Sequence, residues 1–260
     1  MDNLDISSVS NPKIKRLKKL LDSSSKRKEA GQFIVETPRF IQAILEKEPD
    51  LIDSVFLSLD FEGELLSYLH DIEQLYTVKP ILLDRVTLLR KSFGVVAVFN
   101  KPHYDIESLL PDFKRICICD AVQTPSNIGA IIRNAAAFGI DALFLTEGCA
   151  DVYHPEAIRA MAGHCVHVPV FELDETLFTS LADSGFTFYD CDPHSDTSIK
   201  DITFAEKSCF ILGSEGQGLI SSYLINHVNK IGLTIPMSEH VESLNVAVSS
   251  GIIFNCLYSN

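Results

Sequence analysis

The amino-acid sequence predicts an α/β protein, with a small N-terminal α/β domain followed by a larger domain built on a mostly parallel sheet. From Phe113 onward, apolar strand-like runs alternate with helical patterns, as is typical of a parallel sheet covered by helices on both faces. A hydrophobic content of 46% is enough for a packed core. The length of 260 residues accommodates two domains.

Residues 1–105 have the pattern of the small domain. Ile14, Leu17 and Leu20 repeat at helical spacing, with lysines on the opposite face. Thr37 and Pro38 are favoured residue types for the N-cap and the first position of a second helix. Strands are expected at "QFIV" (32–35), "DSVFLSL" (53–59), "LYTVKP" (75–80) and "GVVAVFN" (94–100).

A polar, proline-containing stretch predicts a linker at 106–112, so the larger domain is expected to span 113–260. Its expected strands are 115–122, 141–146, 167–171, 186–192, 208–213 and 230–236. Five helices are expected in it. The first begins at Asn127, the next three cover 154–162, 174–182 and 219–226, and the last runs from Ser243 to the end. In sheets of this kind, ligands bind beyond the carboxyl ends of the strands.

The cysteines and histidines do not predict a metal site. None of the seven cysteines forms a CxxC pair, and the group of His164, Cys165 and His167 has no second pair beside it. Reduced thiols fit a cytoplasmic protein. We expect no signal peptide, because "MDNLDISSVS" lacks a basic segment followed by an apolar one. We expect no membrane partner, because no apolar run approaches the ~20 residues of a membrane span.

The charge is distributed unevenly. The formal net charge is −13, which by itself disfavours nucleic acid as a partner. Residues 13–28 nevertheless hold eight basic residues against one acidic residue, whereas the rest of the chain holds 14 basic and 34 acidic residues. This basic arm (residues 13–28) is either a solvated helix face or a surface that contacts phosphates.

Three loops at expected strand ends contain residues that could bind a ligand. The first, "QTPSNIGAIIRNAAAFG", opens a helix with Asn127 as its expected N-cap and ends it at Gly139; Arg133 lies in apolar company inside it. The second, "FILGSEGQGLI", lets the backbone pass close to a planar ligand through Gly213, Gly216 and Gly218. Each loop alone could equally be an ordinary turn.

The third loop, "LTIPMSEHVESLNVAVSSGIIFN", leads from a strand that ends at Pro236 into an apolar helix. A C-terminal helix of this composition is most often part of the core. Its small residues would also suit close packing against a second helix. The three loops acquire a specific meaning only in combination.

Together, the loops resemble the three motifs of the SpoU (TrmH-type) RNA 2'-O-ribose methyltransferases of the knotted SPOUT class. The matching residues are Asn-x-Gly-x-x-x-Arg at 127–133, Leu-Gly-Ser-Glu-Gly at 212–216, and Ile-Pro-Met at 235–237 with Ser-Leu-Asn at 243–245. The N-terminal half is similar to the L30e-like substrate-binding domain of family members. The chain has Glu36-Thr37-Pro38-Arg39 where members usually have Glu-Gly before the arginine.

This resemblance implies a C-terminal domain with a deep trefoil knot, a homodimer through that domain, and S-adenosylmethionine (AdoMet) as the cofactor, with no metal. The implied catalytic residues are Arg133, Asn127, Glu215, Ser243 and Asn245. The implied cofactor-binding residues are Leu212, Gly213, Ser214, Gly216, Ile235, Pro236, Met237, Leu244 and Asn245. The RNA-binding residues expected with this reading are Lys13, Lys15, Arg16, Lys18, Lys19, Arg27, Lys28 and Arg39.

The chemistry gives the arginine a purpose. A ribose 2'-hydroxyl is a weak nucleophile at neutral pH, so methyl transfer needs a group that accepts its proton or stabilises the developing charge. A protonated guanidinium at Arg133 can hold the phosphate beside the target ribose and stabilise the alkoxide. We therefore expect electrostatic assistance rather than a free guanidine acting as the base.

The sequence leaves several functions open. Ribosomal RNA of the 23S type is the first expectation for the substrate, and tRNA remains open. A non-catalytic RNA-binding or ribosome-assembly factor on the same fold is a second reading. A nucleotide-dependent oxidoreductase is a third, although the order GxxGxG at 213–218 differs from the GxGxxG of dinucleotide-binding proteins.

Overall fold

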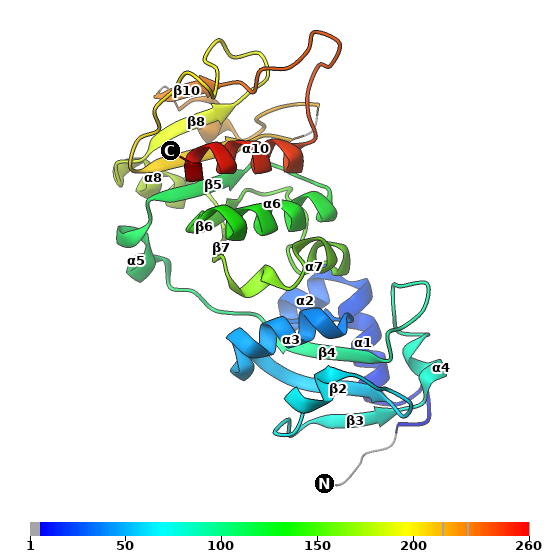
Figure 1. Ribbon diagram of the computed structural model, residues 1–260. Coiled ribbons are helices and arrows are strands. Elements are labelled where there is room, and N and C mark those ends of the chain that lie inside the picture. The colour runs from blue at the N-terminus through cyan, green and yellow to red at the C-terminus, as the bar shows by residue number, and fades with distance from the viewer. Residues whose placement is uncertain (1–5, 215, 228, 260) are drawn as a thin grey trace. The chain divides into compact units, whose positions relative to one another are not determined.

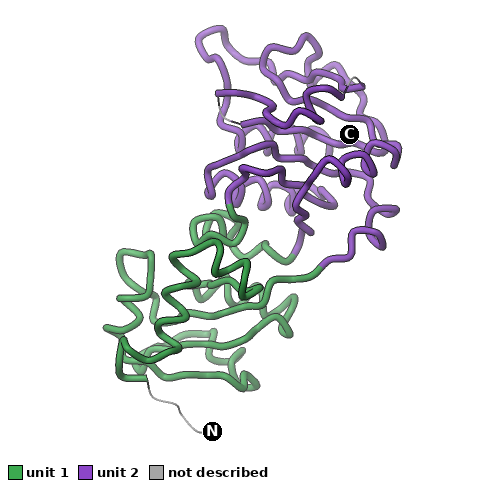
Figure 2. Tube along the Cα trace, turned by 180° about the vertical axis from the view of Figure 1, so that it is seen from behind, with its two compact units in different colours: residues 1–103, 151–166 green, residues 104–150, 167–260 purple. Residues whose placement is uncertain are grey.

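The structure, a computed structural model, describes residues 6–214, 216–227 and 229–259. These residues form two compact units, which are coloured separately in Figure 2. Unit 1 contains residues 6–103 and 151–166, and unit 2 contains 104–150 and 167–259. Segment 151–166 thus packs with unit 1, although it lies inside the range 113–260 that the sequence predicts as one domain. No helix in the described ranges is long and apolar enough to span a membrane.

Unit 1 is built on a four-stranded sheet with the order β1-β4-β2-β3 (Figure 1). Strand β4 pairs antiparallel with β1 and β2, and β3 pairs parallel with β2. The strands are β1 (Gln32–Val35), β2 (Ile52–Ser58), β3 (Leu75–Val78) and β4 (Val95–Asn100). The helices are α1 (Pro12–Asp22), α2 (Ser24–Ala30), α3 (Pro38–Lys47), α4 (Pro80–Leu83) and α7 (Pro155–Met161), with the 3-10 turns η1 (Pro49–Leu51), η2 (Glu64–Tyr68) and η4 (His164–Val166).

The helices of unit 1 begin where the sequence supplies caps. Asn11 accepts a hydrogen bond from the backbone of Lys13 at the start of α1, and Ser23 does the same for Lys26 in α2. Thr37 is the N-cap residue of α3 and Pro38 its first residue, as predicted, although the Thr37 side chain makes no capping bond. The apolar stripe of α1 packs against the sheet in one buried cluster with β2, β3 and β4.

A buried ion pair joins α2 to segment 151–166 within unit 1. The Arg27 side chain is only 1% exposed; its Nε donates to Asp151 at 2.7 Å, and its Nη1 donates to the carbonyls of Leu20 and Leu21. Burial alone would raise the pKa of Asp151, but hydrogen bonds led by the one from Arg27 lower it. The prediction that Arg27 contacts RNA is therefore wrong, because the side chain is buried and its Nε and Nη1 donate hydrogen bonds inside the unit.

Unit 2 contains a six-stranded sheet with the order β10-β8-β9-β5-β6-β7. All of its strand pairs are parallel, which confirms the predicted parallel sheet. The strands are β5 (Arg115–Cys119), β6 (Ala142–Leu145), β7 (Val170–Glu172), β8 (Thr187–Cys191), β9 (Ser208–Leu212) and β10 (Lys230–Leu233). The helices are α5 (Ile106–Leu109), α6 (Pro125–Phe138), α8 (Glu175–Asp183), α9 (Ser222–Ile225) and α10 (Val246–Ser259), with the turn η3 (Leu110–Asp112).

Several predicted boundaries in unit 2 need correction. The expected linker 106–112 is helical, forming α5 and η3. Helix α6 begins at Pro125 with Thr124 as its N-cap residue, so Asn127 lies inside the first turn. Gly139 has the left-handed backbone expected after the helix, with φ of 67°. Helix α10 begins at Val246 rather than Ser243, and α10 and α6 pack side by side (Figure 1).

Replacing Arg27 by alanine should destabilise the protein by about 3–5 kcal/mol, because the substitution leaves the carboxylate of Asp151 buried without its cation. Urea denaturation followed by circular dichroism measures this change. Lys18→Ala is the control, since Lys18 is exposed on α1 and its loss should change stability by less than about 0.5 kcal/mol. Equal stability of the two variants would contradict the structural role of Arg27.

Candidate active site

A cavity of about 930 Å³ lies at the carboxyl ends of β8, β9 and β10. Three segments line it: the end of β8, the glycine-rich loop after β9, and the segment between β10 and α10. The second and third predicted loops therefore meet at one place. Of the predicted cofactor-binding residues, the lining includes Leu212, Gly213, Ser214, Gly216, Ile235, Met237, Leu244 and Asn245, and it also includes Ser243.

Two predicted residues stand apart from this lining. Pro236 is not one of the residues that border the cavity, although its neighbours Ile235 and Met237 are. Glu215 lies outside the described residues. The catalytic role expected for Glu215 and the cofactor contact expected for Pro236 stay predictions.

The glycine-rich loop folds back on itself. Ser214 and Gly218 exchange backbone hydrogen bonds of 2.8 and 3.1 Å, and Gly216 and Gly218 have φ values of 81° and 69°. A Cβ atom at Gly213 would lie 2.6 Å from the carbonyl carbon of Gly218. Only glycine fits at 213, because the clash would be with backbone rather than with a flexible side chain.

The carboxylate of Asp120 holds this loop to the sheet. Asp120 directly follows β5 and is fully buried. It accepts hydrogen bonds from the backbone N–H groups of Ile220 and Ser221 at 2.5 and 3.0 Å. The hydroxyls of Ser221 and Thr146 donate to its other oxygen at 2.5 and 2.8 Å. We call Asp120, Thr146, Ile220 and Ser221 the Asp120 network.

The network keeps Asp120 ionised. Burial alone would raise the pKa of this carboxyl, but the hydrogen bonds that it accepts, led by the one from the Ser221 hydroxyl, outweigh burial and lower the pKa. The Thr146 hydroxyl also accepts from the backbone N–H of Ala121, which has a positive φ of 51°. The strand ends of β5 and β6 and the loop after β9 are therefore fixed to one buried charge.

Helix α6, which carries the first motif, is joined to the third loop by two asparagines. Nδ2 of Asn245 donates to Oδ1 of Asn127 at 3.1 Å, while Oδ1 of Asn245 accepts from the backbone of Ala247 and Val248 and so caps α10. Asn134, two helical turns after Asn127 on α6, donates to the Ala247 carbonyl and the Ser250 hydroxyl. These bonds place the first motif next to the third loop.

Arg133 does not face the core, contrary to the interpretation that the sequence suggested. Its side chain is exposed on α6 and is not part of the cavity lining. Its position follows from helical geometry, because the buried face of α6 is made by Ile128, Ile131, Ile132 and Ala135. Within the described part of the chain, the guanidinium makes no ion pair and is free to bind an anion.

The cavity also holds an ion pair that the sequence analysis missed. Nζ of Lys230, the first residue of β10, lies 3.4 Å from a carboxylate oxygen of Asp190, near the end of the neighbouring strand β8. It also donates to the carbonyls of Leu224 and Ile225. Burial raises the pKa of Asp190, and Lys230 acts in the opposite direction. Both side chains border the cavity, so they can contribute polar groups to a bound ligand.

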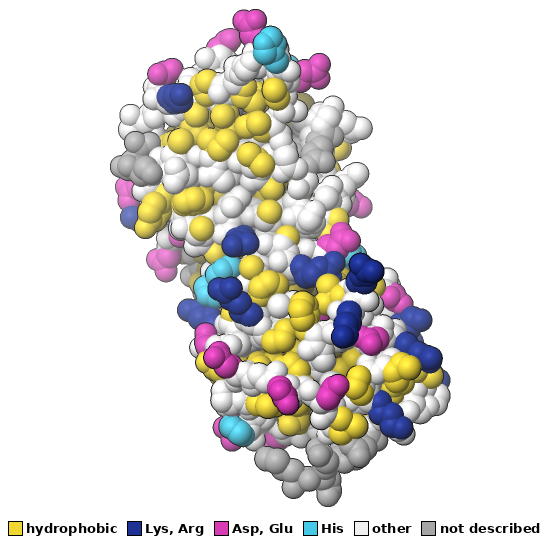
Figure 3. Space-filling view, turned by 45° about the vertical axis from the view of Figure 1, so that its right-hand side comes forward, with side chains coloured by type: hydrophobic (Ala, Val, Ile, Leu, Met, Phe, Trp, Pro, Cys, Tyr) yellow, Lys and Arg dark blue, Asp and Glu magenta, His cyan; other side chains and the backbone are white. Residues whose placement is uncertain are grey.

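The remaining residues of the basic arm differ in how far they are available. Lys15, Lys18, Lys19 and Lys28 are exposed. Lys13 instead donates to the hydroxyl of Tyr76, and Arg16 forms an ion pair with Asp53 at 3.0 Å. Arg39, on α3, is exposed. Figure 3 shows lysine and arginine side chains gathered on one face of unit 1, with apolar side chains between them.

Asp120 and the pair Asp190–Lys230 are the functional candidates that sequence reasoning did not find. Both aspartates come at the carboxyl end of a predicted strand, which is where ligand-binding and site-forming residues gather in parallel sheets. This position was the available signal. Among the described residues, no group of three or more His, Cys, Asp or Glu side chains is arranged to hold a metal ion.

Comparisons with known proteins agree with this geometry. Residues 114–255 match the model of the SpoU rRNA Methylase family, and the chain belongs to this family. It is 28% identical over 249 residues to the 23S rRNA (guanosine(2553)-2'-O)-methyltransferase RlmP of Bacillus subtilis, covering 95% of this chain and 96% of that protein. It is 25% identical to a 23S rRNA (uridine(2479)-2'-O)-methyltransferase of Streptomyces viridochromogenes, covering 91% and 86%.

Solved structures share the fold. The SpoU methyltransferase AviRb of Streptomyces viridochromogenes, solved with AdoMet, superimposes with a TM-score of 0.83 at 24% identity, covering 96% of this chain and 97% of that one. An AdoMet-bound rRNA methyltransferase of Sinorhizobium meliloti gives a TM-score of 0.82 at 20% identity, covering 97% and 96%. The α/β fold with a parallel-sheet domain is therefore that of SpoU methyltransferases.

Replacing Asp120 by asparagine should lower the free energy of unfolding by about 2–4 kcal/mol at neutral pH, because an amide nitrogen would replace one of the two accepting oxygens and either the N–H groups or the hydroxyls would lose their acceptor. A lowered carboxyl pKa stabilises the fold above the unfolded value of about 3.8, and this contribution is lost as the pH falls through the folded pKa. The difference between wild type and variant should therefore shrink below about pH 4. Denaturant titrations at a series of pH values test this, and a difference independent of pH would contradict it.

Proposed function

We propose that this protein is an AdoMet-dependent RNA 2'-O-ribose methyltransferase that acts on ribosomal RNA of the 23S type. The observation that carries the proposal is that the three motif loops meet. The second and third loops line one cavity, and the first is joined to the third by the hydrogen bond between Asn245 and Asn127. Membership of the SpoU rRNA Methylase family and the 23S rRNA methyltransferases among its relatives support the same reaction.

The cavity fits the cofactor. Its volume of about 930 Å³ lies in the range of ligand pockets, and the close approach of Gly213 to Gly218 leaves backbone rather than side chain at its wall. AdoMet, when bound, supplies a methyl group on a sulfonium, which needs no metal. In this proposal Leu212, Gly213, Ser214 and Gly216 border the adenosine from one side, and Ile235, Pro236, Met237, Leu244 and Asn245 from the other.

Arg133 is the proposed catalytic cation. Its exposed guanidinium can hold the phosphate next to the target ribose and lower the energy of the charge that develops on the 2'-oxygen. Asn127, Glu215, Ser243 and Asn245 are proposed to position the ribose and the arginine. The hydrogen bond from Asn245 to Asn127 supports a shared positioning role, because it restrains the orientation of both amides.

Unit 2 is also proposed to contain the trefoil knot and to form a homodimer. The return of the chain from the edge strand β10 to α10, packed on α6, supports the knot. Val248 and Tyr258 on α10 are 52% and 63% exposed, and Figure 3 shows an apolar area on unit 2, which supports a dimer interface. Unit 1 is proposed to be the L30e-like RNA-binding domain, and the protein to be cytoplasmic.

Replacing Arg133 by alanine should reduce methyl transfer about 100- to 1,000-fold, as expected when a charge-stabilising group is lost from a transition state. Transfer of labelled methyl from AdoMet to total rRNA and to tRNA measures the effect and identifies the RNA. Calorimetry should find AdoMet binding unchanged in this variant. Lys200→Ala, which removes an exposed cation of unit 2, is the control. Full turnover of the arginine variant would refute its role.

The exposed lysines of the basic arm should contribute phosphate contacts. Replacing Lys18 and Lys19 together by alanine should weaken RNA binding and make the slope of log K against log salt shallower by about 1–2. The reason is that RNA binding releases about one counterion fewer for each phosphate contact that is lost. Fluorescence anisotropy at several salt concentrations measures the slope. The pair Lys47→Ala and Lys79→Ala, exposed in the same unit, serves as the charge-matched control. An unchanged slope for the Lys18 and Lys19 variant would show that the arm is only a solvated face.

A further inference from the structure

One carboxylate in the cavity of unit 2 has acceptor capacity left for a ligand. Asp190, near the end of β8, borders the cavity, and its side chain is 23% exposed. Burial raises the pKa of this carboxyl, because the charged form has lost part of its hydration. Among the described residues, the one partner of this carboxylate is Nζ of Lys230, at 3.4 Å. An ionised carboxylate can accept about four hydrogen bonds, so Asp190 can accept further bonds from a ligand.

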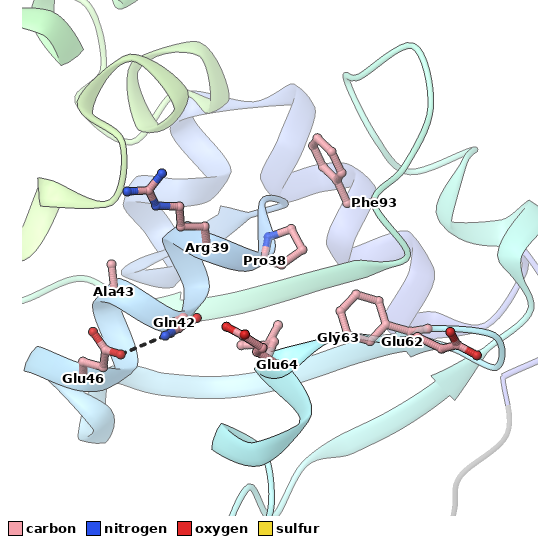
Figure 4. Close-up of a pocket in the computed structure, with 11 residues that line it drawn as sticks. Pro38, Arg39, Gln42, Ala43, Glu46, Glu62, Gly63, Glu64 and Phe93 are labelled. Carbon is pink, nitrogen blue, oxygen red and sulfur yellow. Dashed lines mark hydrogen bonds between the residues drawn. The ribbon is translucent and has the colours of Figure 1, made fainter.

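A cavity of about 770 Å³ in unit 1 provides a contrast. Glu46 lines that cavity, but its side chain is exposed. It accepts hydrogen bonds from Gln42 at 2.9 Å (Figure 4) and from the hydroxyl of Tyr68 at 2.7 Å. Water and these donors satisfy a carboxylate at the surface, so Glu46 implies no ligand. Asp190 differs because it is mostly buried and has a single cation beside it.

Lys230 balances the charge of Asp190 without offering a donor to a ligand. Its Nζ donates to the carbonyls of Leu224 and Ile225 at 2.7 and 3.4 Å, and the side chain is only 14% exposed. An ammonium has three donors, and the two carbonyls and the Asp190 carboxylate account for all of them. The ligand group that suits Asp190 is therefore a neutral donor, because a cationic group would be repelled by the Lys230 ammonium.

Asp190 lies on the face of the sheet opposite α10. Successive side chains of a strand point to opposite faces of the sheet. Phe188 packs against Phe178 of α8, and Asp190 follows two residues later in β8, on the same face. Tyr189, between them, points to the other face, where it stacks on Phe210, which also contacts α10. The cavity is bordered by both α9 and α10, so it reaches across the end of the sheet.

The reacting end of the cofactor belongs on the α10 side of this cavity. The first motif meets the cavity there, through the hydrogen bond from Asn245 to Asn127. In the proposed function, the adenosine lies against the glycine-rich loop after β9. The continuation of that loop, at Leu219, borders the cavity together with Ile225 of α9. Asp190 therefore lies at the end of the cavity that the proposed function assigns to the adenosine.

Adenosine carries two kinds of donor, the 6-amino group of the base and the two hydroxyls of the ribose. The amino group lies between N1 and N7, which are both acceptors and would be repelled by a carboxylate. The 2'- and 3'-hydroxyls are adjacent donors that match the two oxygens of a carboxylate. An acidic side chain binds the ribose in the same way in dinucleotide-binding proteins. The ribose diol is therefore the part of adenosine that suits Asp190.

We propose that Asp190 is a cofactor-positioning residue that accepts hydrogen bonds from the ribose 2'- and 3'-hydroxyls of AdoMet. Lys230 neutralises its charge and fixes its orientation. The inference rests on the proposed function and deepens it. It adds a side-chain contact to the cofactor site from two residues that lie outside the three motif loops.

The test measures ligand binding to the full-length protein by calorimetry. The ligands are S-adenosylhomocysteine (AdoHcy), which is the cofactor without its methyl group, and the 2'-deoxy and 3'-deoxy forms of AdoHcy. Wild type should bind AdoHcy about tenfold more tightly than either deoxy form, because each form lacks one hydrogen bond to a charged group. Asp190→Asn should reduce this preference, since an amide has only one accepting oxygen.

A second variant and a control separate the contact from the stability of the fold. Asp190→Ala combined with Lys230→Met should abolish the preference while leaving no buried charge unpaired, and its thermal unfolding should remain cooperative. Asp192→Asn is the matched control, because Asp192 borders the same cavity but its Oδ1 accepts from the backbone N–H of His194. This control should retain the full preference for AdoHcy over the deoxy forms.

Equal affinity of wild type for AdoHcy and both deoxy forms would overturn the inference. A preference that persists in the double variant would also overturn it. S-inosylhomocysteine, which lacks the 6-amino group, should remain sensitive to Asp190→Asn; loss of that sensitivity would show that the carboxylate binds the base instead. AdoHcy binding without a ribose preference would leave the proposed function standing, whereas a wild type that does not bind AdoHcy would remove both.

Discussion

The Asp120 network is the constraint on which the candidate active site depends. One buried carboxylate accepts four hydrogen bonds from the end of β6 and from the loop beyond β9. A charge in the protein interior is stable only when it is fully hydrogen-bonded. The loop beyond β9 therefore cannot separate from the ends of β5 and β6 without leaving the Asp120 carboxylate exposed to water or short of hydrogen-bond donors. The glycine-rich turn, whose own backbone bonds are few, is thereby held in the shape that leaves a cavity beside Gly213.

The same principle organises unit 1 around a different charge. Arg27 donates hydrogen bonds to Asp151 and to two carbonyls at the end of α1. Segment 151–166 lies inside the region matched by the family model, 114–255, but it packs in unit 1 with the N-terminal residues. A truncation at residue 113 would remove the partners of this segment and leave Asp151 without its cation. The two units are compact, but they are not independent pieces of sequence.

Charged side chains are distributed differently in the two units. The net charge of −13 would repel RNA, yet exposed lysines and arginines collect on unit 1 (Figure 3). On α6, Arg133 is exposed and makes no ion pair with the residues that the structure describes. The cavity of unit 2 pairs Asp190 with Lys230 and so carries little net charge from these two groups. In the proposed reaction, long-range attraction comes from unit 1, and unit 2 contributes one cation where negative charge develops.

Periodicity and spacing determined the α/β class, the parallel sheet, most strand positions and the three motif loops, because these depend on local backbone preferences and on the alternation of apolar residues. Helix starts at Pro125 and Val246 were misjudged by a few residues, since capping competes with neighbouring turns. Whether a basic residue is buried or exposed could not be predicted: Arg27 and Lys28 adjoin in sequence, yet Arg27 is buried against Asp151, 124 positions away, whereas Lys28 is exposed. Only the tertiary structure decided the pairing of Arg27 with Asp151, the outward position of Arg133 and the roles of Asp120 and Asp190. Each of these depends on contacts between segments that are far apart in the sequence, and local sequence patterns do not predict such contacts.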